Sequence, residues 1–108
     1  AVLDALVYFQ FVKKEDPNVE ELKNYISQNW EPINEKTLRY HLLRMKKMGY
    51  IENSQARFYF KHPTEGDRFD PSAVFASLFE SHYKQVVNSI NTVINELKNK
   101  NIIEGVKQ

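Results

Sequence analysis

The sequence predicts an α+β fold that is mainly helical, with three helices, a β-hairpin and one long C-terminal helix. Three observations support this prediction. Apolar residues recur at helical spacing up to residue 48, β-favouring residues flank a polar turn between 50 and 60, and bulky apolar residues alternate in steps of three and four from 76 to 97. Since 108 residues are too few for two full hydrophobic cores, we expect one domain with an appended helix.

The composition is typical of a folded protein, with 42% apolar and 27% charged residues. The chain has no cysteine, which excludes disulfides and thiolate metal sites. The most apolar segment, residues 1–12, includes Asp4 and Gln10 and is shorter than the roughly 20 residues that a membrane span needs. It also lacks the basic start and cleavage site of a signal peptide. We therefore expect a cytoplasmic protein with no membrane partner.

The first 30 residues predict two helices. Residues 1–14 form a helix that is apolar nearly all round, which would need cover on more than one side. The second helix begins at a cap, Asp16 or Asn18, with Pro17 suited to a first turn. Its apolar stripe consists of Val19, Leu22, Ile26 and Trp30.

The third helix is expected from about residue 35 to 48. Pro32 pushes Glu31 out of helical geometry, so a short extended connector precedes the Asn34 cap. Gly49 supplies the left-handed residue that commonly ends a helix. One face of this helix carries Leu38, His41, Leu42, Met45 and Met48.

A β-hairpin follows the third helix directly. The segment YIENSQARFYF, residues 50–60, places β-favouring residues on both sides of a polar tip. Residues 63–70 gather Pro, Gly and charged side chains and predict a linker.

The last helix is predicted over residues 71–101, with Asp70 as its cap and a tail at 102–108. Its apolar residues Ala76, Phe79, Tyr83, Val86, Ile90, Val93 and Leu97 follow the a/d repeat of a coiled coil. Packing of this helix on its own domain is the alternative to dimerisation. The heptad residues together with a second stripe, Phe75, Leu78, Val87 and Ile94, exceed what one small domain can cover. We therefore predict a homodimer with the interface Phe75, Phe79, Tyr83, Val86, Ile90, Val93 and Leu97.

Positive charge gathers in one part of the chain. Residues 33–61 hold seven Lys and Arg against two acids, whereas the rest holds eight basic and twelve acidic residues. A formal net charge of +1 therefore conceals a basic segment, which creates a local field attractive to polyanions.

Three helices followed by a hairpin is the order of a winged helix-turn-helix, here predicted over residues 1–62. In that fold the third helix enters the DNA major groove and the hairpin reaches the adjacent backbone or minor groove. On the third helix, the face opposite the core is basic and carries an exposed tyrosine and leucine. The predicted DNA-binding residues are Lys36, Thr37, Arg39, Tyr40, Leu43, Arg44 and Lys47 on the helix, and Ser54, Gln55 and Arg57 at the wing. The alternative is a solvated helix face whose last cations complement the helix dipole.

The segment EKTLRYHLLRMKKMGYIE resembles winged-helix transcriptional regulators, especially the PadR-like and archaeal Lrs14-like groups and more loosely the MarR and ArsR families. The resemblance lies in a polar start, a Thr-Leu pair, a Leu and Met core stripe, and Gly-aromatic-Ile at the wing. It implies a terminal dimerisation helix after the wing and regulation of promoters. The cysteines of the ArsR metal site are absent here.

These observations together predict a sequence-specific regulator of transcription, most simply a repressor, that binds double-stranded DNA as a homodimer associated with the nucleoid. Its half-sites would lie about 34 Å apart. The alternative hypotheses are a DNA-organising or plasmid-partition protein with low sequence specificity, and a winged-helix module that binds protein partners. No catalytic motif appears, and we expect neither an enzyme nor a cofactor or metal site. Any small-molecule effector is unknown.

Overall fold

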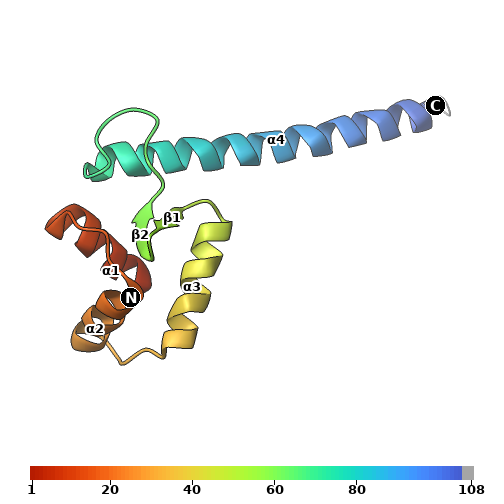
Figure 1. Cartoon of the computed structure of the whole chain (residues 1–108). Coiled ribbons are helices and arrows are strands. Elements are labelled where there is room, and N and C mark those ends of the chain that lie inside the picture. The colour runs from red at the N-terminus through yellow and green to blue at the C-terminus, as the bar shows by residue number, and fades with distance from the viewer. Residues whose placement is uncertain (106–108) are drawn as a thin grey trace. The chain divides into compact units, whose positions relative to one another are not determined.

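The computed structural model describes the backbone of residues 1–105 and the side chains of residues 1–100. The elements in chain order are α1 (Val2–Val7), the π-helix η1 (Tyr8–Lys13), α2 (Val19–Asn29), α3 (Glu35–Lys47), β1 (Ile51–Ser54), β2 (Arg57–Phe60) and α4 (Pro71–Gly105) (Figure 1). The two strands pair antiparallel. The protein is therefore α+β and mainly helical, with a hairpin and a long C-terminal helix, as the sequence predicts.

The chain divides into two compact units, residues 1–78 and the remainder of α4 from Phe79. The first unit includes the start of α4, because Val74 is completely buried in its core. The sequence assigned 71–101 to a separate helix and 102–108 to a tail. The helix instead continues to Gly105, and residues 106–108 of the predicted tail lie outside the described residues.

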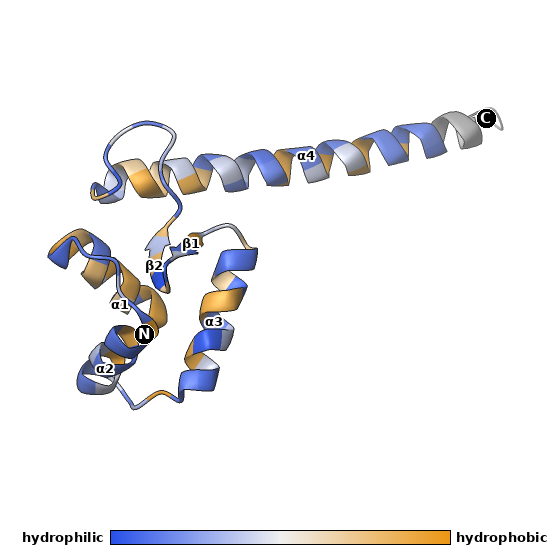
Figure 2. Cartoon of the chain, viewed as in Figure 1, coloured by the Kyte–Doolittle hydropathy of each residue, from blue (hydrophilic) through white to orange (hydrophobic). Residues whose placement is uncertain are grey.

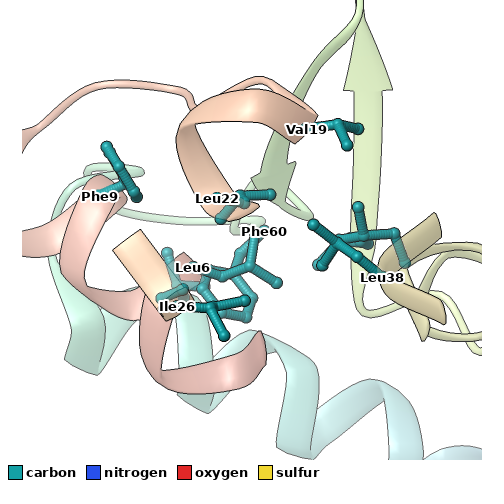
Figure 3. Close-up of a cluster of buried hydrophobic side chains, with 11 residues drawn as sticks. Leu6, Phe9, Val19, Leu22, Ile26, Leu38 and Phe60 are labelled. Carbon is teal, nitrogen blue, oxygen red and sulfur yellow. The ribbon is translucent and has the colours of Figure 1, made fainter. Parts of the chain in front are cut away.

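The core of the first unit is formed by α1, η1, α2, α3, the hairpin and the start of α4 together. Leu6, Leu22, Ile26 and Phe60 lie close together in this core (Figure 3). Burial of each such side chain stabilises the fold by about 1.5–3 kcal/mol. The complete buried set is Ala5, Leu6, Phe9, Val19, Leu22, Ile26, Leu38, Leu42, Ile51, Phe60 and Val74.

The first helical segment differs from the prediction of one α-helix over residues 1–14. After Val7 the chain continues as a π-helix, which Lys14 ends in the left-handed conformation at φ 57°. Phe9 and Gln10 are both buried in the π-helix. Tyr8 stacks on Tyr25 of α2 and Phe11 packs against Phe60 and Phe75, so this segment is covered on more than one side, as expected. The sequence of α1 is largely hydrophobic (Figure 2), and of the large apolar residues in α1 and η1 only Leu3 and Val12 are exposed.

Asn18, not Asp16, is the cap of α2. Its Oδ1 accepts a hydrogen bond from the Glu21 N–H at 2.8 Å, and Glu21 Oε1 accepts one from the Asn18 N–H at 3.3 Å. This reciprocal arrangement satisfies two backbone donors that the helix start would otherwise leave open. Trp30 was expected on the buried stripe, but α2 ends at Asn29 and the Trp30 side chain is half-exposed, with its ring edge-on to Tyr25.

The apolar stripe of α3 is narrower than predicted. Leu38 and Leu42 are fully buried and Met45 is half-buried, as expected. His41 and Met48 are exposed, because they lie at one margin of the stripe and line an open pocket of about 420 Å³ beside the start of α1.

The loop before α4 is fixed to the first unit and is not a free linker. The Arg68 guanidinium makes two hydrogen bonds to the Asp16 carboxylate at 2.8 and 2.9 Å. The Arg68 backbone carbonyl accepts a third from Gln10 Nε2 at 2.7 Å. Asp70 then caps α4 as predicted, since its Oδ1 accepts from the Ser72 N–H at 3.0 Å.

The backbone N–H groups on the outer side of β2 are also satisfied. The Phe58 N–H donates to the Pro17 carbonyl at 2.9 Å, and the Phe60 N–H donates to Gln10 Oε1 at 2.8 Å. Gln10 is fully buried, and its two hydrogen bonds join the π-helix to the hairpin and to the loop before α4.

Candidate nucleic-acid interface

Helix α3 positions the candidate interface, and its ends are set by local sequence. At the start, Asn34 Oδ1 accepts a hydrogen bond from the Lys36 N–H at 2.7 Å. At the end, Gly49 has φ 81° and its N–H donates to the Lys46 carbonyl at 3.0 Å. Leu38 and Leu42 anchor one side of the helix in the core, so the opposite side faces solvent.

The structure brings all seven predicted helix residues to this solvent-exposed side. Tyr40 is 56% exposed and Leu43 is 50% exposed. A helix face that meets only water seldom carries two large apolar side chains that are half-exposed. The exposed set is Lys36, Thr37, Arg39, Tyr40, Leu43, Arg44 and Lys47, and we call it the α3 outer face.

Two arginines on the α3 outer face have different surroundings. Arg39 pairs with Glu35 one turn earlier, through Nε at 3.1 Å and Nη2 at 3.0 Å to the same carboxylate oxygen. The Arg44 guanidinium lies over the Tyr40 ring, 5.9 Å from its centre, in a cation–π contact. Arg39 is thus oriented by a carboxylate and Arg44 by an aromatic ring.

The hairpin turn exposes two further predicted residues. Ser54 and Gln55 are both exposed, and the turn consists of Gln55 and Ala56 between the paired residues Ser54 and Arg57. Both turn residues have positive φ, 52° and 62°. This is the geometry of a type I′ hairpin turn, which matches the twist of the flanking strands but favours Asn and Gly.

Arg57 is held by groups within the protein. Its Nη1 donates to the Asp16 carbonyl at 2.6 Å and to Glu21 Oε1 at 3.1 Å. The same Glu21 oxygen closes the cap of α2. Arg57 therefore ties the hairpin to the start of α2, and its predicted contact with DNA remains a prediction.

A polar pocket of about 380 Å³ separates the hairpin from the starts of α2 and α3. Sequence reasoning did not anticipate this pocket, because its walls come from three segments that are distant in the chain. Its lining residues are Asn18, Val19, Glu20, Glu35, Arg39, Asn53, Ala56 and Phe58.

The second unit carries the predicted coiled-coil residues on the surface of one chain. The rings of Phe79 and Tyr83 stack with centres 6.4 Å apart. Exposed fractions of Phe79, Tyr83, Val86, Ile90, Val93 and Leu97 range from 42% to 71%. Phe75 differs from these residues, because it packs in the first unit against Phe11 and Phe60, with ring centres 5.5 and 5.3 Å apart.

Within the part of the chain that the structure describes, no group of three His, Asp or Glu side chains is placed to hold a metal ion. Among the same residues, no helix has the length and apolar character that crossing a bilayer requires. Comparison of the chain with protein-family models, with curated proteins and with solved structures finds no match.

Proposed function

We propose that this protein is a winged-helix transcriptional regulator that binds duplex DNA as a homodimer. In this proposal α3 enters the major groove and the β1–β2 hairpin is the wing. The observation that carries the proposal is the α3 outer face, in which four cations surround a half-exposed Tyr40 and Leu43.

The side chains of the α3 outer face can contact both the phosphates and the base edges of a duplex. Lysine and arginine neutralise phosphates and release counterions, which supplies affinity that falls steeply with salt. Arginine can also donate two hydrogen bonds to a guanine edge, and an apolar side chain such as Leu43 can contact a thymine methyl group. A surface used for solvation alone has no need of the two large apolar groups.

The hairpin contributes through its tip in this proposal. Ser54 and Gln55 offer neutral donors and acceptors to sugar and phosphate. Because Arg57 is held by Asp16 and Glu21, its main contribution is to fix the hairpin against α2.

A second copy of this chain is the proposed partner of α4. The heptad residues from Phe79 to Leu97 are half-exposed over three repeats, which is a large apolar surface for a monomer to leave in water. Two copies joined along this stripe would present two α3 outer faces to one duplex. Repression by occupying a promoter rests on the resemblance to known regulators, and not on any residue.

DNA binding is tested by selecting from a pool of random duplexes at two salt concentrations and sequencing the bound fraction. A sequence-specific dimer enriches an inverted repeat. Tight binding without enrichment supports the DNA-organising alternative, in which Arg39→Ala and Lys47→Ala weaken binding alike on every sequence. Failure to bind duplex DNA at either salt concentration overturns the proposal in favour of a module for protein partners.

Dimerisation is tested by sedimentation equilibrium of Ile90→Asp. A carboxylate in the centre of the heptad stripe cannot be buried without a partner, so we expect this variant to sediment as a monomer at concentrations where the wild type is a dimer. Asn88→Asp is the matched control, because it introduces the same charge two residues away and outside the stripe. A dimeric Ile90→Asp variant, or a monomeric wild type, would contradict the proposed interface.

A further inference from the structure

The pair Glu35–Arg39 lies at the start of α3, where the recognition helix of the proposed function would meet base edges. Both side chains are largely exposed, at 53% and 61%. Exposed pairs four residues apart in a helix add little to stability. The Glu35–Arg39 pair acts mainly on geometry, because two hydrogen bonds from the Arg39 guanidinium to one carboxylate oxygen restrict rotation of the guanidinium plane.

The donors that the pair leaves available have a definite arrangement. Arg39 uses Nε–H and one Nη2–H on Glu35 Oε1, at 3.1 and 3.0 Å. An arginine has five N–H donors in a fixed fork. Three donors remain, and two of them, one on Nη1 and one on Nη2, lie at the end of the guanidinium and can donate in parallel to the N7 and O6 acceptors of a guanine in the major groove.

We propose that Glu35 is a positioning residue that orients Arg39 for end-on recognition of one guanine in each half-site. This inference rests on the proposed function and deepens it, because it names the base that the protein reads and the residue that makes the reading selective. Glu35 does not touch the base. It fixes the guanidinium beforehand, so that less side-chain freedom is lost when the two hydrogen bonds to guanine form.

The surroundings of Arg39 distinguish it from the other arginine on the α3 outer face. Arg39 lines the pocket between α3 and the hairpin, and a second acid, Glu20, lines the same pocket. Arg44 lies over the Tyr40 ring, and within the described residues it forms no ion pair with a carboxylate. We therefore assign guanine recognition to Arg39 and phosphate contact to Arg44.

The experiment measures binding of wild-type dimer and variants to the duplex selected from the random pool. Each guanine of the half-site is replaced in turn by 7-deazaguanine, which lacks the N7 acceptor. We expect one position per half-site at which this replacement weakens wild-type binding about tenfold, within the range for a bidentate contact. In Glu35→Ala, which removes the accepting oxygen, the penalty at that position falls to about twofold or less, and the preference for guanine there is reduced.

Charge alone predicts the opposite direction for Glu35→Ala. Removal of an acid near phosphates strengthens binding to every sequence, whereas the proposal expects weaker binding to the selected site together with lost discrimination. Glu80→Ala is the matched control. It makes the same charge change in another exposed pair, Glu80–Lys84, with the same spacing and a 3.1 Å separation, and we expect its guanine preference to equal that of the wild type.

The outcomes separate this inference from the proposed function. Full guanine discrimination in Glu35→Ala, with an unchanged unfolding midpoint, overturns the positioning role of Glu35. Binding to duplex DNA with no penalty from 7-deazaguanine at any position overturns guanine recognition and leaves the DNA-binding proposal standing. Wild-type protein that binds no duplex overturns both.

Discussion

Gln10 is the residue whose replacement tests the packing of the first unit most directly. It is 1% exposed, accepts a hydrogen bond from the Phe60 N–H at 2.8 Å and donates one to the Arg68 carbonyl at 2.7 Å. In Gln10→Met the side chain keeps a similar size but loses both polar groups. A buried N–H without a partner costs about 1–3 kcal/mol, and the loss at Arg68 is smaller because its hydrogen bond is only partly buried. The greater hydrophobicity of Met offsets part of this loss, so we expect a net destabilisation of about 1–3 kcal/mol.

Urea unfolding of wild type and Gln10→Met measures this difference at one fixed protein concentration, because association would otherwise shift the apparent stability. Gln28→Met is the control, since Gln28 is exposed on α2. We expect its free energy of unfolding to lie within about 0.5 kcal/mol of wild type. A Gln10→Met variant as stable as this control would refute the assignment of Gln10 as the link between π-helix, hairpin and loop.

Three further changes test other features of the first unit. Ala56→Gly should raise the thermal midpoint of unfolding, because Ala56 has φ 62° in the hairpin turn. Release of this backbone strain stabilises the fold by about 0.5–1 kcal/mol. A lowered midpoint would contradict the turn geometry. Gly66→Ala should destabilise by about 1–3 kcal/mol in urea, since Gly66 has φ 95° and an added Cβ would lie 2.8 Å from Ala73 Cβ. Asp16→Asn should lower the free energy of unfolding by about 1–2 kcal/mol at low salt, because it weakens the two charge-assisted bonds to Arg68; equal stability would show that the ion pair contributes nothing.

The features of α3 could be predicted from sequence because they depend on neighbours in the chain. A helix period of 3.6 residues places Leu38 and Leu42 on one side and Leu43 on the other, and the structure confirms both placements. The cap at Asn34 and the left-handed Gly49 are equally local, and both are observed. The exposure of the α3 outer face follows from the same period.

The surroundings of Arg57 could not be predicted from sequence. Its partners Asp16 and Glu21 are 41 and 36 residues away, and nothing local indicates that the hairpin and the start of α2 meet. The two bonds of Gln10 span 50 and 58 residues and were missed for the same reason. The π-helix was missed because its apolar pattern is indistinguishable from that of an α-helix over so few residues.

The hydrogen bonds on the outer side of β2 have a consequence for association between molecules. An unpaired strand edge is a template on which another chain can add a strand, and this is a common route to aggregation. In β2 the Pro17 carbonyl and the Gln10 side chain occupy the donors of Phe58 and Phe60 that an added strand would need. This edge is therefore capped by the protein itself, so copies of the chain cannot extend the sheet through β2.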